Sequence, residues 1–128
     1  MEFCSHLPPN CPPLDAISFE IKVYCLVSDP PKEDDFHSLQ EKNPNKDYSP
    51  RACQASGLSV FPDLEGIDLA RKVSRTLRKK KLAKGHLSEN SGKIKNTPSD
   101  NTGDTHHTWW PAKNINPSVL FSIVPQNL

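Results

Sequence analysis

The sequence lacks the features that identify a function most directly. No apolar run reaches the roughly 18 residues that a membrane-spanning helix needs. It contains no glycine-rich phosphate loop, nucleophile elbow or zinc-protease pattern. The opening residues, MEFCSHLPPNCPP, lack the basic start and long apolar stretch of a secretory signal, so we expect a cytoplasmic protein without membrane contact. We predict no catalytic residue and no cofactor, and the sequence leaves open whether the protein is an enzyme.

Apolar residues are also scarce. Only 34% of the 128 residues are hydrophobic, and 13 are proline. A chain of this length has room for one domain, and few residues must form its core. Prolines gather at Pro8–Pro9 and Pro12–Pro13, and each one fixes φ and removes a backbone donor. We therefore predict a flexible, disordered proline-rich arm over residues 1–16 and a single domain over residues 17–125.

Cysteine is sparse and scattered. Cys4, Cys11, Cys25 and Cys53 show no spacing that indicates a disulfide framework, and we expect them to be reduced thiols. Cys4, His6 and Cys11 carry groups that suit zinc, but their spacing is not that of a zinc finger and no second pair follows. The sequence therefore predicts no metal site.

Hydrophobic periodicity predicts an α+β fold. Strict alternation over residues 17–27 indicates a strand, and PDLEGIDLARKVSRTL, residues 62–77, has the spacing of an amphipathic helix. A helix of about two turns is expected after Asp29-Pro30-Pro31. Further extended segments are expected at residues 57–61, 80–87, 92–97, 105–110 and 118–124. This order favours a small mixed or antiparallel sheet with two helices.

Charge is divided unevenly along the chain. Residues 1–70 hold 5 Lys or Arg and 12 Asp or Glu, whereas residues 71–128 hold 11 and 3. Residues 71–84 contain no acid and carry eight cations, namely Arg71, Lys72, Arg75, Arg78, Lys79, Lys80, Lys81 and Lys84. Such a run can contact a polyanion, either a nucleic acid or an acidic protein. The alternative is a face that is solvated or paired within the fold, with cations at a helix C-terminus.

Several segments together resemble a known family. VYCLV, DPPKEDDF, GLSVFPDLEGIDLARKV, GKIKNTP and HHTWWP follow one another over about residues 22–124. This pattern resembles a family of small uncharacterised bacterial proteins that have a GLSVF strand–helix element and a late HHTWW element. The resemblance implies a small bacterial protein and implies no activity.

The layout is also loosely similar to that of ADP-ribosyltransferases. Their dinucleotide pocket uses an Arg or His on an early strand, a Ser, Thr or Tyr on a middle strand, and a later Glu. Here Cys25 stands where the Arg is expected, Ser59 matches the middle strand, and no glutamate follows Glu89. The similarity implies a diverged NAD-dependent enzyme with Ser59 and His107 in its pocket. A toxin–antitoxin or defence component is a further alternative.

The HHTWW element supplies the remaining candidate residues. Adjacent residues on a strand point to opposite faces, so the two histidines lie on different faces, and so do the two tryptophans. We expect His107 and Trp109 on one side and His106 and Trp110 on the other, with one tryptophan buried and one exposed. The candidate ligand-binding residues are Ser59, His106, His107, Trp109 and Trp110. The alternative is that the histidines only bond loop backbone. Our prediction is a small binding protein that contacts a polyanion through residues 71–84.

Overall fold

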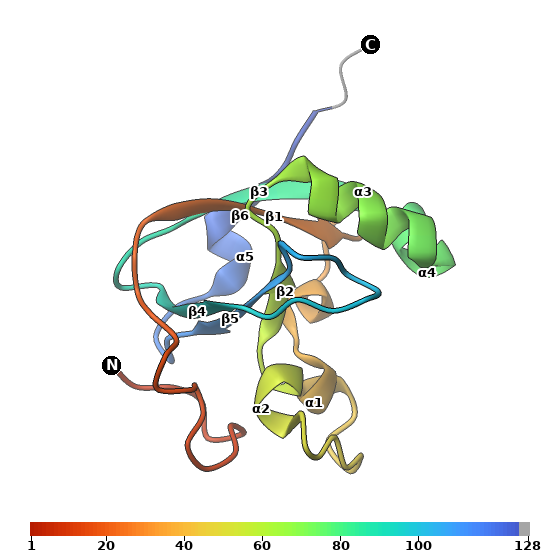
Figure 1. The fold of residues 1–128 in the computed structure, drawn as a ribbon. Helices are drawn as coiled ribbons and strands as arrows, with labels where there is room; N and C mark the ends of the chain where they lie inside the picture. Colours follow the sequence, from red (N-terminus) through yellow and green to blue (C-terminus); the bar gives the residue numbers. More distant parts are fainter. Residues whose placement is uncertain (126–128) are drawn as a thin grey trace.

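Two three-stranded antiparallel sheets form the centre of the molecule (Figure 1). The structure is a computed structural model that describes residues 1–125. The first sheet has the order β1-β3-β6, with bounds Ile21–Val27, Lys81–Leu87 and Phe121–Ile123. The second has the order β2-β5-β4, with bounds Leu58–Val60, His107–Pro111 and Gly92–Asn96. The α+β class is therefore confirmed, with two small sheets in place of the single sheet expected.

The core lies between the two sheets. Val23 and Leu87 of the first sheet pack with Val60, Ile94 and Trp109 of the second, and all are at least 96% buried. Each lies on the inward side of its strand because alternate side chains share one face. Burial of these side chains supplies about 25 cal/mol per Å² of apolar area removed from water.

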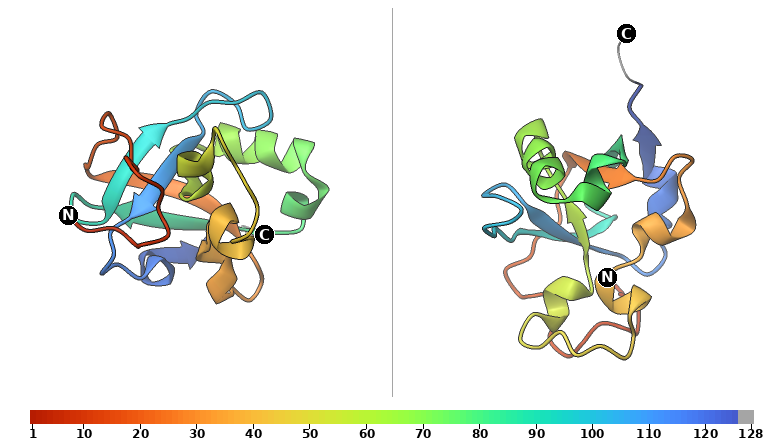
Figure 2. Two further views of the ribbon diagram at one scale, coloured as in Figure 1. Left: turned by 90° about the horizontal axis from the view of Figure 1, so that it is seen from below. Right: turned by 90° about the vertical axis from the view of Figure 1, so that its right-hand side faces the viewer.

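The helix α3 (Leu64–Val73) covers the other face of the first sheet. Its inward residues Ile67 and Ala70 pack with Phe61, and Leu26 and Leu82 of the sheet lie against them. Asp63 caps the helix by accepting a hydrogen bond from the Gly66 N–H at 3.0 Å. The right-hand view of Figure 2 shows α3 on the opposite side of the strands from the short helices α1 and α2.

The predicted helix over residues 62–77 is interrupted. Ser74 has extended backbone angles, φ −127° and ψ 116°, and its side chain accepts from the Leu77 N–H to start α4 (Arg75–Arg78). A serine in an otherwise helical pattern offers the backbone this alternative partner, and the periodicity of the apolar residues does not reveal it.

The remaining helices are single turns. The expected two-turn helix is two pieces, the 3-10 helix η1 (Glu33–Phe36) and α1 (Leu39–Lys42), and α2 (Ala52–Ala55) lies where no helix was predicted. The predicted strand over residues 118–124 begins as α5 (Pro117–Leu120) before β6. Asn116 caps α5 and Pro117 occupies its first position, which are strong local signals for a helix start.

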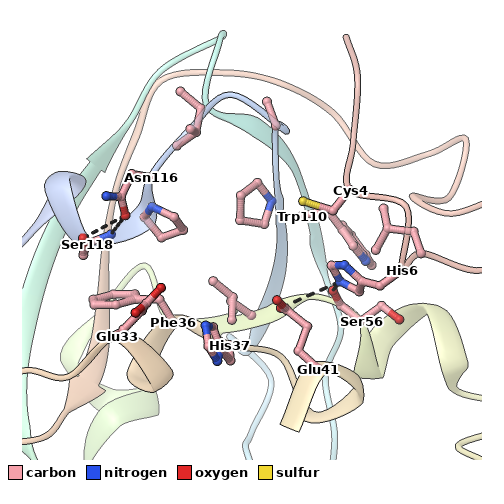
Figure 3. A pocket seen from close by; sticks show the side chains of 16 residues that line it. Cys4, His6, Glu33, Phe36, His37, Glu41, Ser56, Trp110, Asn116 and Ser118 are labelled. Atoms are coloured by element: carbon pink, nitrogen blue, oxygen red, sulfur yellow. Dashed lines mark hydrogen bonds and ion pairs between the residues drawn. The ribbon is translucent and has the colours of Figure 1, made fainter. Parts of the chain in front are cut away.

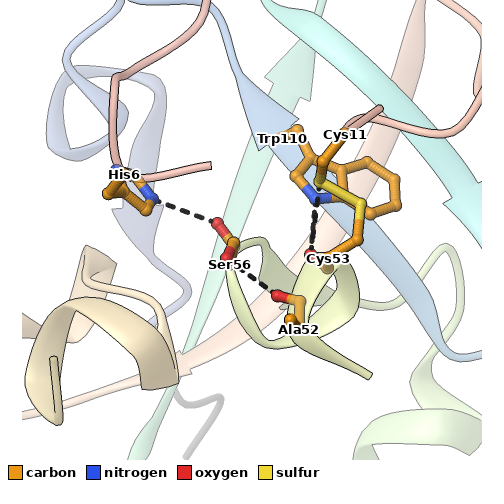
Figure 4. The surroundings of a disulfide bond; sticks show 6 residues. All are labelled: His6, Cys11, Ala52, Cys53, Ser56 and Trp110. Carbon is orange, nitrogen blue, oxygen red and sulfur yellow. Dashed lines mark hydrogen bonds between the residues drawn. A yellow bond between two sulfur atoms is a disulfide. The ribbon is translucent and has the colours of Figure 1, made fainter. Parts of the chain in front are cut away.

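The structure does not show the flexible arm predicted for residues 1–16. Cys11 forms a disulfide with Cys53, so neither cysteine is the reduced thiol that we expected (Figure 4). Ala16 is 98% buried, and the Lys113 N–H donates to the Glu2 carbonyl at 2.8 Å. The proline-rich composition of this segment favours disorder. Composition cannot show that Cys11 has a bonding partner 42 residues further along the chain, which holds the segment in place.

The helices were also compared with the length that a membrane-spanning helix needs. Within residues 1–125, none of the helices has the length and apolar character required to cross a bilayer.

Candidate functional site

The HHTWW element keeps the predicted alternation but not the predicted exposure. Trp109 points into the core, and Trp110 lies on the opposite face of the second sheet. Both indoles are 99% buried, so the expected exposed tryptophan is absent. The Trp110 Nε1–H donates to the Cys53 carbonyl at 2.9 Å, beside the disulfide (Figure 4). A tryptophan stacking platform is therefore not available on this strand.

His106, immediately before β5, is held at both ring nitrogens. Its Nδ1 lies 2.8 Å from the Thr97 carbonyl oxygen, and its Nε2 lies 2.9 Å from the Ser59 Oγ. A carbonyl can only accept, so Nδ1 carries the proton and Nε2 is the acceptor. The Ser59 hydroxyl therefore donates its hydrogen bond to His106.

The environment of His106 keeps the imidazole neutral. The side chain is 97% buried, and the Phe61 ring meets it edge-on at a centroid distance of 5.4 Å. Burial lowers the pKa of His106 below its ordinary value, although the Thr97 backbone bond opposes this shift. The ring is consequently uncharged at neutral pH, and its Nε2 carries no proton.

His107 does not take the position that the dinucleotide interpretation requires. Its Nδ1 contacts the Thr105 carbonyl at 2.7 Å, and its side chain lies on the opposite side of the strand from His106. The structure thus brings His106, and not His107, to Ser59.

Ser59 lies at a cavity of about 260 Å³, which we call the Ser59 pocket. Unlike His106, Ser59 is exposed to solvent. The pocket is bounded by β1, β2, the η1–α1 segment, α3, α4 and β6. Its walls include Cys25, Phe36, Leu39, Phe61, Leu77, Lys80, Trp109 and Phe121.

The pocket opens where β1 and β2 separate. Tyr24 and Phe61 exchange two backbone hydrogen bonds of 2.7 and 2.9 Å, and within residues 1–125 this bridge is isolated. Successive peptide groups of an antiparallel strand face alternate sides. The peptide groups of Leu26 and Ser59, two positions beyond the bridge on each strand, therefore face the gap.

Two further residues line the pocket wall: Trp109, which the sequence offered as a ligand-binding candidate, and Cys25, which it did not. The Trp109 Nε1–H is buried and has no hydrogen-bond partner within residues 1–125. Burial raises the pKa of the Cys25 thiol to about 12, which leaves it protonated and unreactive at neutral pH. The position at which the similarity to ADP-ribosyltransferases led us to expect Arg thus carries an uncharged group.

A second cavity, of about 200 Å³, lies beneath the N-terminal segment (Figure 3). Cys4 and His6 form one wall, and His6 Nε2 lies 3.8 Å from a carboxylate oxygen of Glu41 and 3.4 Å from the Ser56 carbonyl. Trp110 lies beside them, and Asn116 lies on the far side of the cavity (Figure 3). The sequence did not suggest this cavity, because one wall is the segment predicted to be disordered.

The basic run divides into two groups. Arg71 Nη2 donates to the Lys80 carbonyl at 2.9 Å, and Arg78 Nε donates to the Arg71 carbonyl at 2.9 Å. Lys80 Nζ lies 3.6 Å from the buried Asp35 carboxylate. These three contacts link α3 and α4 to each other, to the turn before β3 and to η1, although the Arg78 side chain is itself exposed.

The other cations lie at the surface. Lys72, Arg75, Lys79 and Lys84 are exposed, whereas Lys81 is half-buried. Lys84 shares the outward face of β3 with Leu82, which packs beneath α3, so these exposed residues occupy one side of the molecule. We call Lys72, Arg75, Lys79 and Lys84 the basic surface.

Comparison with protein-family models, curated proteins and solved structures finds no match to this chain. Within residues 1–125, no three or more His, Cys, Asp or Glu side chains are grouped so that they could hold a metal ion. The two resemblances noted in the sequence therefore stay expectations, and any function must be argued from the geometry.

Proposed function

We propose that the protein is a binding protein that contacts a polyanion, a nucleic acid or an acidic protein, through the basic surface. The observation that supports this proposal is that only some of the cations in residues 71–84 are used in internal contacts. Arg71, Arg78 and Lys80 contact backbone carbonyls or Asp35, whereas the four cations of the basic surface are exposed. A fixed group of like charges attracts an anionic partner over a range set by salt.

The alternative, a diverged dinucleotide-dependent transferase, has less geometric support. Ser59 does line a pocket, but His107 is directed elsewhere and Cys25 carries no charge. The cavity of about 260 Å³ is also smaller than the roughly 300–1,000 Å³ of typical small-molecule sites. A dinucleotide is too large for that space.

The cytoplasmic location and the disulfide point in different directions. We propose the cytoplasm from the features of the sequence alone, whereas the Cys11–Cys53 disulfide is typical of oxidising compartments.

A salt titration with a matched variant tests the proposed binding. Lys72→Ala, Arg75→Ala and Lys79→Ala together remove three exposed charges without touching an internal contact. Lys32→Ala, Lys46→Ala and Lys113→Ala remove three exposed charges elsewhere and serve as the control. Arg78 and Lys80 are left intact because their loss would disturb the fold.

The expected result is a loss of affinity for a short labelled DNA duplex in the first variant only. The slope of log K against log salt should fall by about 0.9 for each phosphate contact that is lost. Polyglutamate as a competitor distinguishes an acidic protein partner from a nucleic acid. Equal affinities for both variants, or no binding at low salt, would refute the proposal.

A further inference from the structure

We propose that Ser59 is a nucleophile activated by His106, and that the Ser59 pocket hydrolyses small esters with an apolar acyl group. This proposal is independent of the polyanion proposal, because it uses a different part of the molecule. The starting observation is the hydrogen bond of 2.9 Å between the exposed Ser59 hydroxyl and the buried His106 ring.

The hydrogen-bond chain gives each group the protonation state that the chemistry needs. The Thr97 carbonyl fixes the proton on His106 Nδ1, which leaves Nε2 as a base directed at the Ser59 Oγ. A serine is a weak nucleophile until such a base removes its proton, and a third group must orient the base. Thr97 is a positioning residue that acts through its backbone oxygen, a role usually filled by a carboxylate.

The gap between β1 and β2 supplies donors for the negative charge that develops on the ester oxygen. The Ser59 N–H faces this gap, and the peptide group of Leu26 faces it from the other strand. Backbone N–H groups held by a sheet are preorganised donors, and one such donor contributes about 100- to 1,000-fold to the rate. The nucleophile and an oxyanion donor thus belong to one residue.

The walls of the pocket select the substrate class. Phe36, Phe61 and Trp109 give it an aromatic lining, and about 260 Å³ holds a short acyl chain or a single ring. A phosphate ester fits less well, since Lys80, a cation on the wall, is already paired with Asp35.

The reaction balances without any co-reactant except water. In the first step the Ser59 proton moves to His106 Nε2 while Oγ bonds to the acyl carbon. The bond from that carbon to the alcohol oxygen then breaks, and the alcohol takes the proton. In the second step water gives a proton to Nε2 and its oxygen bonds to the acyl carbon. The acyl–Oγ bond breaks, the proton returns to Oγ, and a carboxylic acid leaves.

Covalent labelling of the full chain by a fluorophosphonate tests the nucleophile. The serine oxygen displaces fluoride from phosphorus, and peptide mapping locates the adduct. Ser59 should be labelled at least about 100-fold faster than Ser118, since a general base contributes about 100- to 10,000-fold. Ser118 is exposed and bonds only to Asn116, so it is an internal reference. Equal labelling of the two serines would overturn the proposal.

A second experiment measures ester hydrolysis and labelling in variants of the protein. Ser59→Ala should abolish both labelling and hydrolysis of p-nitrophenyl butyrate, and His106→Gln should slow both by about 100-fold or more. Ser118→Ala is the control and should retain the full rate, because Ser118 is exposed and lies outside the Ser59 pocket. Circular dichroism checks that each variant is folded. If His106→Gln does not fold, the ratio of Ser59 to Ser118 labelling in the native chain still decides. Hydrolysis that persists in folded Ser59→Ala would refute the assignment.

Discussion

The contact between Ser59 and His106 cannot be predicted from the residues that flank either of them in the sequence. Ser59 and His106 are 47 positions apart, and only the pairing of β2 with β5 brings them together. The sequence identified both as candidates by residue type, but it favoured His107 as the partner. It could not choose correctly, because adjacent residues of β5 face opposite sides, and only the packing of the two sheets decides which side carries the Ser59 hydroxyl.

His106 makes stability depend on pH. Its pKa in the folded protein is lowered, so the unfolded chain binds more protons over the range below the ordinary value of 6.5. The free energy of unfolding should therefore hold its full value above that pH and decrease as the pH falls through the folded pKa. Urea titrations across this range should show the decrease. His106→Gln should show a smaller decrease, and identical profiles would contradict the assignment.

Gly66 gives a second prediction at the scale of one residue. From helix propensity alone, alanine should strengthen the first turn of α3 by up to about 1 kcal/mol. A Cβ at this position, however, would lie 2.3 Å from Phe61 Cδ1 and 2.9 Å from Thr105 Oγ1. We expect Gly66→Ala to destabilise the protein by about 1–3 kcal/mol, because Phe61 must move from the core. Chemical denaturation measures the change, and a stabilised variant would contradict the packing argument.

At the scale of elements, local signals predicted the strands well and the helices less well. Alternation placed β1, β2, β3 and β4 to within a few residues, since one face of each strand is buried. The short helices were missed or merged because single turns carry too few residues for periodicity. Their starts depend on caps, such as Ser38 for α1 and Asn116 for α5. The division of the strands between two sheets has no local signal at all.

The cap at Ser74 is testable as an element-scale feature. Its side chain accepts from the Leu77 N–H at 3.3 Å and redirects the chain from α3 into α4. Ser74→Ala should cost about 1 kcal/mol, measured by urea denaturation. Ser74→Asp restores an acceptor and should recover most of the loss. A neutral Ser74→Ala would mean that α3 and α4 merge into the single helix expected from periodicity.

At the scale of the whole molecule, the Cys11–Cys53 disulfide adds a covalent constraint to a fold with a small hydrophobic core. The Cys11–Cys53 disulfide attaches the N-terminal segment to α2, and Trp110 bonds to the carbonyl of Cys53 in the same cluster. A chain with 34% hydrophobic residues gains little from burial alone, so this link has a large share in holding the segment in place. Cys4 and His6 of this segment line the second cavity, so the position of the segment sets the shape of that cavity.

Removal of the disulfide should therefore be the largest of these effects on stability. The bond joins positions 42 residues apart, and closing a loop of that length removes about 4 kcal/mol of chain entropy from the unfolded state. Cys11→Ser with Cys53→Ser should lower the free energy of unfolding by up to that amount, and a reducing agent should do the same to the native chain. Cys4→Ser is the matched control, since Cys4 is a free thiol. If the reducing agent changes nothing, the bond is absent in solution, and the cytoplasmic location is the better supported one.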